Sequence, residues 1–209
     1  MIDFCLIGQK AAFRPGWNTV EQISNSPVTV EKHLQHQRYL FHNFIDFKKA
    51  FDRVWHAGLW QVLKNFNTEK GLVQTIQALD DNSTSAILMN SQLGEIFKTT
   101  EGIRQGCLLS PILFNLFLQK IMQETLHDHH TSISIGGRPI CNLRFTDIDL
   151  MDSKNRELQD LTNRLVDRAT AYVQEVSTEK SKIMTNSTNT ISTNISMNGQ
   201  RLAEVTSFM

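Results

Sequence analysis

Hydrophobic positions follow a helical spacing in most of the chain and a strand spacing in a few short segments. In the segment FHNFIDF at 41–47, alternation puts Phe44 and Asp46 on one face of a strand and Ile45 and Phe47 on the other. Four further segments carry apolar stripes that recur every three or four residues and predict helices: Leu59, Val62, Leu63 and Phe66; Leu72, Ile76 and Leu79; Leu113, Phe117 and Ile121; and Leu158, Leu161, Leu165, Ala169 and Tyr172.

Two hairpins and one more helix are predicted near the middle and the two ends of the chain. Residues 83–99 predict a hairpin with Asn90 and Gly94 in its turn. Asn198-Gly199, in the segment ISMNGQRL, is typical of a two-residue hairpin turn. Residues from about 20 to 40 have a helix-like pattern, which places a helix before the first strand.

The central part of the chain combines a helix start with closely spaced strands. Ser110-Pro111 predicts a helix start, with a hydroxyl at the N-cap and proline in the first turn, and the helix should reach about Leu126. Gly136-Gly137 predicts a hairpin turn, and strands are expected at 140–145 and 148–151. This mixed order of helices and antiparallel pairs favours an α+β fold.

Composition restricts the function classes. The chain has 209 residues, and its 21 basic residues are balanced by 21 acidic ones. This balance argues against a strongly basic nucleic-acid-binding domain. The three cysteines form no CxxC pair, which argues against a structural zinc site and fits a reducing compartment. The most apolar stretch, 107–118, is far shorter than the ~20 residues of a membrane span, so we expect an intracellular protein of the cytoplasm or nucleus, neither secreted nor membrane-bound.

Acidic residues inside apolar strands are the candidate chemistry. Asp46 lies in FIDFKKAFD, and a carboxylate there is costly to bury without a cation. Asp147 and Asp149 lie in FTDIDLM, about a hundred residues later. If the fold brings such acids together, their hard oxygen ligands suit Mg²⁺. The alternatives are an exposed or lysine-paired Asp46 and a solvated acidic hairpin, and the strand pattern alone leaves both open.

Four segments in order resemble the successive motifs of reverse transcriptases: FIDFKKAFD, GIRQGCLLSPILF, RFTDIDLM and STEKSKI. They look most like those of LINE-type, non-LTR retrotransposons, and the resemblance covers nearly the whole chain. It implies RNA-templated DNA synthesis, with two Mg²⁺ ions assisting nucleotidyl transfer to a primer 3′-hydroxyl. It also implies a right-hand polymerase fold, with a fingers remnant at 1–41 and a palm at 42–209 that ends where the primer-grip region starts. A small antiparallel sheet backed by helices is expected, and we expect the thumb to be absent, as in a truncated copy.

The resemblance assigns roles to individual residues. Asp46 matches the first catalytic aspartate and metal ligand, and Lys180 matches a lysine proposed to protonate the leaving pyrophosphate. Phe51 matches the bulky side chain that excludes a 2′-hydroxyl from the incoming nucleotide. Gln105-Gly106 matches a turn that template and nucleotide approach closely. Arg14 matches a position near template or nucleotide.

One motif departs from the family pattern at a catalytic position. The family has an aromatic residue, Ala and two adjacent aspartates, whereas this chain has Phe-Thr-Asp-Ile at 145–148. Asp147 matches the first of the two acids, as catalytic residue and metal ligand, but Ile148 replaces the second. Asp149 is a further candidate ligand, although a one-residue shift turns a strand side chain to the opposite face unless a bulge intervenes. We therefore expect impaired synthesis, and the alternative is a catalytically dead nucleic-acid-binding or non-functional relic.

The expected partners are an RNA template, a DNA primer and dNTP. Phosphate contacts are expected from Arg14, Lys48, Arg104 and Lys180, and Arg104 is also counted among the nucleotide- or template-binding residues. Trp17 stands where the family tends to have arginine. Since phosphate contacts dominate the affinity of such complexes, a neutral chain should bind primer-template weakly.

Overall fold

The computed structural model describes residues 39–81, 84–99, 101–129, 133–135, 138–139, 141–144, 148–185 and 193–205. These residues belong to two compact units. The first comprises the described residues up to Lys48 and from Ile121 onward, and the second is Lys49–Lys120. Arg14, Asp147 and nearly all of the helix expected at about 20–40 lie outside the described residues, so these predictions stand untested.

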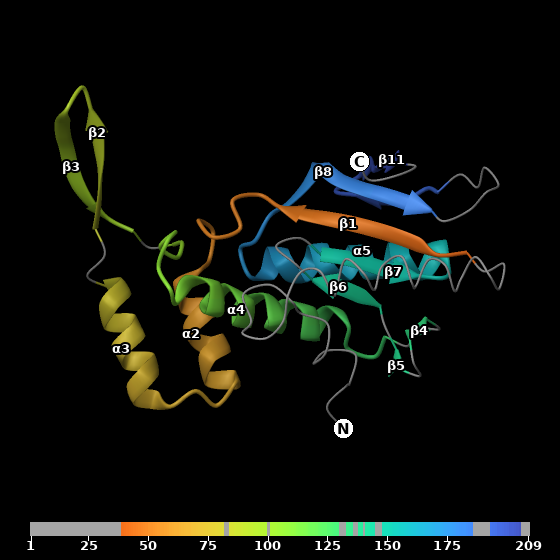
Figure 1. The fold of residues 1–209 in the computed structure, drawn as a ribbon, viewed down its shortest axis with the longest axis horizontal. Coiled ribbons are helices and arrows are strands. Elements are labelled where there is room, and N and C mark those ends of the chain that lie inside the picture. The colour runs from red at the N-terminus through yellow and green to blue at the C-terminus, as the bar shows by residue number, and fades with distance from the viewer. Residues whose placement is uncertain are drawn as a thin grey trace. The chain divides into compact units, whose positions relative to one another are not determined.

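The first unit is built on a five-stranded sheet with the strand order β11-β8-β1-β7-β6 (Figure 1). Its neighbouring strands are antiparallel, except that β11 and β8 are parallel. The elements of this sheet and its helix are β1 (Phe41–Phe47), β6 (Asn142–Arg144), β7 (Ile148–Asp152), α5 (Asn155–Ala171), β8 (Val176–Thr185) and β11 (Ala203–Val205). The described part of this unit also contains two small hairpins: β4 (Ser134–Ile135) with β5 (Arg138–Pro139), and β9 (Ser196–Met197) with β10 (Gln200–Arg201).

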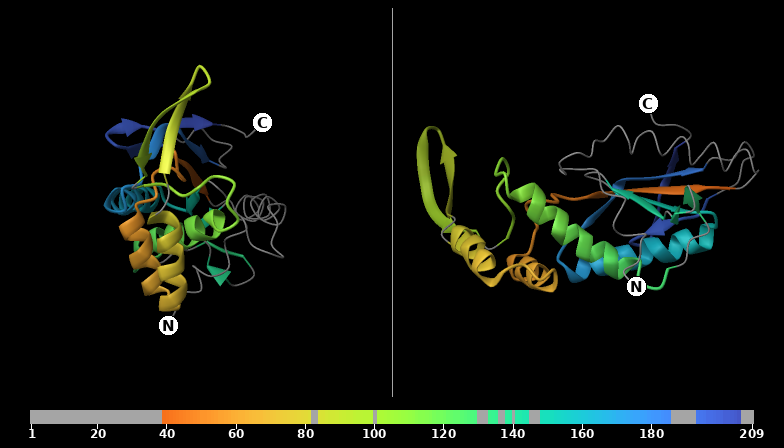
Figure 2. Two further views of the ribbon diagram at one scale, coloured as in Figure 1. Left: turned by 90° about the vertical axis from the view of Figure 1, so that its left-hand side faces the viewer. Right: turned by 60° about the horizontal axis from the view of Figure 1, so that its bottom comes forward.

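The two faces of β1 differ as its sequence predicts. Ile45 and Phe47 are buried, whereas Phe44 and Asp46 are partly exposed. Helix α5 packs against β1 and β7, as Figures 1 and 2 show. On the buried face Asn43 donates a hydrogen bond of 2.8 Å to Thr162 of α5. Leu158, Leu161, Leu165 and Ala169 of the predicted α5 stripe are buried, whereas Tyr172 follows the helix and is partly exposed. Helix α5 thus covers one face of the sheet; on the other face Asp46 is partly exposed and His42 is buried.

The second unit contains two helices, a hairpin and the start of a third helix. Its elements are α2 (His56–Asn65), α3 (Lys70–Asp81), β2 (Thr84–Met89), β3 (Gln92–Lys98) and α4 (Ser110–Thr125), the last of which begins in this unit. The start of α4 at Ser110 confirms the helix predicted from Ser110-Pro111. The stripe predicted for α3 is partly wrong, because Leu72 and Leu79 are 51% and 59% exposed while Val73 and Ile76 are buried. Helix α2 contacts only part of the apolar surface of α3, and Leu72 and Leu79 lie on the part that stays exposed.

The hairpin turns show one confirmed prediction and one correction. Asn198-Gly199 joins β9 and β10 with positive φ at both residues, as a two-residue turn requires. In the β2–β3 hairpin the turn is Asn90-Ser91, with φ of 49° and 63°, and Gly94 lies within β3. A Cβ on Gly94 would lie 3.1 Å from the carbonyl oxygen of Ile87, beside an irregularity in the pairing. Gly94 therefore permits close backbone approach at a bulge and is not a turn residue.

No helix in the described parts of the chain combines the length and the apolar character that a membrane crossing needs.

Candidate active site

Asp46 lies near the end of β1 with one of its carboxylate oxygens buried. The residue is 27% exposed, but Oδ2 is shielded from solvent and accepts no hydrogen bond from the described residues. Lys180 forms an ion pair with it: its Nζ lies 3.7 Å from Oδ2, and its side chain is 75% exposed. An unbonded buried carboxylate oxygen is costly in free energy, so it needs a compensating positive charge.

An irregularity in β8 brings Lys180 to Asp46. Phe44 pairs with Lys182 and Asp46 pairs with Ser177, so β8 advances five residues while β1 advances two. The extra residues of β8 bulge out of the ladder, and bulges of this kind redirect side chains. Asp46 and Lys180, which the sequence motifs single out and which lie 134 positions apart in the chain, therefore meet in the same unit.

Asp149 has a different environment on the neighbouring strand. It lies opposite Phe44 in the pairing of β1 with β7 and is 4% exposed. Nδ1 of His42, a fully buried residue of β1, donates a hydrogen bond of 2.9 Å to its Oδ2. Burial raises the pKa of the Asp149 carboxyl above its ordinary value, and His42 opposes that rise. The carboxylate is thus bound inside the protein to His42.

In the second unit, backbone hydrogen bonds hold the residues 101–106 against the chain that follows β1. The N–H groups of Gly102 and Ile103 donate to the carbonyls of Val54 and Phe51, each at 2.9 Å. Gly102 has a φ of +88°, and a Cβ there would lie 2.9 Å from the carbonyl oxygen of Asp52. Only glycine fits this combination of close approach and left-handed backbone.

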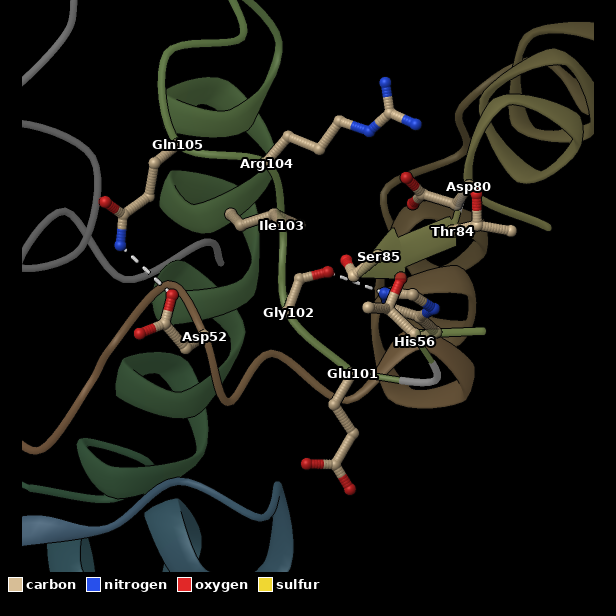
Figure 3. A pocket seen from close by; sticks show the side chains of 11 residues that line it. Asp52, His56, Asp80, Thr84, Ser85, Glu101, Gly102, Ile103, Arg104 and Gln105 are labelled. Atoms are coloured by element: carbon tan, nitrogen blue, oxygen red, sulfur yellow. Dashed lines mark hydrogen bonds between the residues drawn. The ribbon is translucent and has the colours of Figure 1, made fainter. Parts of the chain in front are cut away.

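Two side chains add to this attachment, as Figure 3 shows. Nε2 of His56 donates to the carbonyl oxygen of Gly102 at 2.6 Å, and the amide of Gln105 donates to Oδ1 of Asp52 at 3.0 Å. Gly106 has a φ of +84° with no atom within 4 Å of an added Cβ, so its backbone conformation, and not lack of space, favours glycine. The loop that carries the predicted Gln105-Gly106 turn is therefore ordered by both backbone and side-chain bonds.

A cavity of about 320 Å³ lies beside this loop (Figure 3). Its lining consists of Asp52, His56, Asp80, Thr84, Ser85, Thr99, Glu101, Gly102, Ile103, Arg104 and Gln105. Arg104 and Gln105, two of the predicted nucleotide- or template-binding residues, line this cavity, and three carboxylates and one imidazole accompany them. Its volume is at the lower end of small-molecule sites.

Phe51, predicted to exclude a 2′-hydroxyl, stacks on Phe114 of α4 with ring centroids 4.7 Å apart. Cys107, near the start of α4, is exposed, and backbone hydrogen bonds lower the pKa of its thiol. No fixed base accompanies Cys107 among the contacts of the described residues, and we assign it no catalytic role.

No group of three or more histidine, cysteine, aspartate or glutamate side chains in the described residues could hold a metal ion. Since Asp147 lies outside those residues, the expected pairing of its carboxylate with Asp46 is not tested. Sequence reasoning missed His42 and His56. His42 lies at strand spacing from Phe44, but its partner could be found only from the pairing of β1 with β7.

Comparison with known proteins agrees with the motif order. The family described as reverse transcriptase (RNA-dependent DNA polymerase) matches residues 8–201. The chain is 30% identical over 89 residues to the Pol polyprotein of the type-2 retrotransposable element R2DM of Drosophila melanogaster, covering 43% of this chain and 8% of that protein. It is 28% identical over 124 residues to the Pol polyprotein of the type-1 retrotransposable element R2 of Popillia japonica, covering 58% and 20%.

Solved structures show the same fold. A truncated apo telomerase from Candida tropicalis matches with a TM-score of 0.64 at 16% identity, covering 83% of this chain and 36% of that one. A telomerase from Candida albicans in complex with a telomeric RNA fragment matches with a TM-score of 0.65 at 13% identity, covering 90% and 32%. The chain thus spans between 8% and 20% of these two curated relatives. The predicted resemblance is confirmed, and the chain belongs to the reverse transcriptase (RNA-dependent DNA polymerase) family.

Proposed function

We propose that this chain is the palm-centred part of an RNA-directed DNA polymerase, with residues 1–41 as a fingers remnant, 42–209 as palm and Asp46 at the catalytic centre. The observation that carries the proposal is the buried Oδ2 of Asp46, which accepts no hydrogen bond from the described residues and has Lys180 at 3.7 Å. Its substrates would be an RNA template, a DNA primer and dNTP. In the second unit, Phe51 and the loop with Arg104, Gln105 and Gly106 would contact nucleotide or template, and Arg14 would do so from the fingers.

Of the ligands that a magnesium site needs, the described residues supply one suitable carboxylate, that of Asp46. Mg²⁺ prefers hard oxygen ligands, and Oδ2 of Asp46 has a lone pair that no described donor uses. We propose Asp147 as the second protein ligand, with water and substrate phosphates filling the other positions. When bound, two ions would neutralise charge on the reacting phosphate and lower the pKa of the primer hydroxyl.

Lys180 would act on the leaving group. In nucleotidyl transfer the primer 3′-oxygen forms a bond to the α-phosphorus, and the bond between that phosphorus and the pyrophosphate oxygen breaks. The ammonium of Lys180 can give a proton to the departing oxygen. Its side chain is 75% exposed and lies 3.7 Å from Asp46, so it could turn from Asp46 toward a bound nucleotide.

We further propose that synthesis is impaired in this chain. Asp149 is hydrogen-bonded to His42 inside the sheet, which favours a structural role over metal binding. Ile148, at the position of the missing acid, is fully buried and lies opposite Ile45. The site would then have two carboxylates where the family has three, and we expect weaker metal binding. A nucleic-acid-binding protein without catalysis is the second candidate, and the missing acid favours it.

Mn²⁺ titration and primer extension on an RNA template test the proposal together. Inserting one aspartate after Asp147 supplies the missing carboxylate and keeps Ile148 in the core, whereas Ile148→Asp would bury a charge. We expect the insertion to tighten Mn²⁺ binding about tenfold or more and to increase metal-dependent extension from an undetectable level.

Asp46→Asn in the same insertion background should abolish both gains, and Asp160→Asn, at an exposed acid of α5, is the matched control. Metal binding that persists after Asp46→Asn would refute the proposed centre. Efficient extension by the unmodified chain would refute the proposed impairment.

A further inference from the structure

The backbone of Asp46 is held by a side chain of β8 at the bulge. Its N–H donates to Oγ of Ser181 at 3.3 Å. The same hydroxyl donates to the carbonyl oxygen of Ser177 at 2.7 Å. Ser181 is fully buried and therefore connects β1 to both ends of the bulge, at the point where the regular pairing is interrupted.

A second serine hydroxyl closes the bulge from within. Oγ of Ser177 accepts a hydrogen bond from the backbone N–H of Lys180 at 3.4 Å, and Ser177 is 3% exposed. We call Ser177 and Ser181 the serine clasp. The clasp fixes the backbone of Asp46 on one side and that of Lys180 on the other, so both side chains start from constrained positions.

We infer that the serine clasp is a positioning device that sets the reach of Lys180 to the Asp46 carboxylate. Its mechanistic meaning rests on the proposed function, in which Asp46 holds metal and Lys180 gives a proton. Ser181 is its main member, because its single hydroxyl bonds the backbone of both strands. Neither serine touches the reacting groups, so both are positioning residues.

A purely structural role is the competing explanation, since buried hydroxyls are normally hydrogen-bonded. Thr125 provides the matched control for it. Its hydroxyl is also fully buried and donates to a backbone carbonyl, that of Ile121 at 2.9 Å, but it lies on α4, away from the bulge of β8. Removing either hydroxyl should cost similar stability, whereas only Ser181 should affect the Asp46 site.

The experiment compares Ser181→Ala, Ser181→Thr, Ser177→Ala and Thr125→Val in the full chain. Amide hydrogen exchange of Asp46, measured by NMR, reports the clasp without any metal or substrate. Removal of one hydrogen bond should accelerate this exchange about tenfold in Ser181→Ala, whereas Thr125→Val should leave it within about twofold of the unmodified chain. Ser181→Thr retains the hydroxyl and should restore slow exchange, and Ser177→Ala should show a smaller effect.

Mn²⁺ affinity in the same variants connects the clasp to the proposed function. We expect several-fold weaker binding in Ser181→Ala and normal binding in Ser181→Thr and Thr125→Val. Unchanged Asp46 exchange and unchanged Mn²⁺ binding in Ser181→Ala would overturn the inference. Equal losses in Thr125→Val would also overturn it, since they would reflect general destabilisation. Absence of Mn²⁺ binding in the unmodified chain would instead refute the proposed function, and Asp46 exchange would still decide the clasp.

Discussion

Two regions of the same sheet contain an aspartate in an apolar strand, and they use it in opposite ways. Asp46, near the end of β1, has a buried carboxylate oxygen that accepts no hydrogen bond from the described residues and an exposed cation, Lys180, at 3.7 Å. Asp149, on β7, is almost completely buried and bonded to His42 at 2.9 Å. A satisfied carboxylate stabilises a fold, whereas an unsatisfied one is available to a ligand. Hydrogen bonding, more than burial, therefore separates the two acids.

Removing His42, the hydrogen-bond partner of Asp149, should give the largest loss of stability among these predictions. His42→Leu leaves a buried carboxyl without its hydrogen bond, and we expect the free energy of unfolding to fall by about 3–5 kcal/mol. Urea denaturation monitored by circular dichroism measures the change. The double variant His42→Leu with Asp149→Leu should recover much of the loss, because no unpaired polar group then remains. A loss below about 1 kcal/mol in the single variant would show that the pair contributes little.

Asp46→Asn should weaken metal binding and, unlike His42→Leu, should change the free energy of unfolding little. Since Oδ2 accepts no hydrogen bond from the described residues, we expect the free energy of unfolding to stay within about 1 kcal/mol of the unmodified value. Mn²⁺ affinity should fall about tenfold or more, because a ligand charge is lost. Asp149→Asn is the comparison variant, and a similar loss of Mn²⁺ affinity there would remove the distinction between the two acids.

The lysines around Asp46 also predict weak nucleic-acid binding, with an affinity that depends only slightly on salt concentration. Lys48 is paired with Glu175 at 2.6 Å and is 48% exposed, whereas Lys180 is 75% exposed, so Lys180 is the more available of the two for a phosphate contact. With few phosphate contacts, the slope of log affinity against log salt should be small, about −0.7 to −0.9 per contact. Fluorescence anisotropy with a primer-template at several salt concentrations tests this. A slope steeper than about −4 would indicate a basic surface that the balanced composition hides.

The smallest expected effect concerns the hydrogen bond between Tyr172 and a third carboxylate, Glu124, and its contribution to stability. The hydroxyl of Tyr172 donates to it at 2.9 Å, and burial together with this bond raises the pKa of Tyr172 to about 12. The folded pKa exceeds the unfolded value of about 10, so the contribution of Tyr172 to stability is complete below pH 10 and is lost toward pH 12. Tyr172→Phe should lower stability by about 1 kcal/mol at neutral pH and remove this alkaline dependence. Unfolding curves from pH 8 to 12 measure both, and parallel pH profiles for the two proteins would contradict the assignment.

The sequence pattern predicted the elements that depend on residues close together in the chain. The alternation in 41–47, the start of α4 at Ser110 and the turn at Asn198-Gly199 are all present in the structure. Each depends on residues close together in sequence, such as a cap followed by proline, or two residues that tolerate positive φ. The hairpin at 83–99 and the place of Asn90 in its turn are also confirmed, and only the placement of Gly94 in that turn was wrong. A glycine can occupy either a turn or a bulge, and only the pairing of β2 with β3 distinguishes them.

The sequence by itself determined the family, because the motifs around Asp46, Gln105 and Lys180 follow one another in the order typical of reverse transcriptases, whereas the roles of these residues stay predictions. Only the tertiary structure decided which acid is hydrogen-bonded. His42 reaches Asp149 through the register of β1 and β7, and Ser181 reaches Asp46 through an irregular register of β1 and β8. The register between strands far apart in the chain is set by the packing of the whole sheet. It therefore cannot be predicted from the spacing of residues along the sequence.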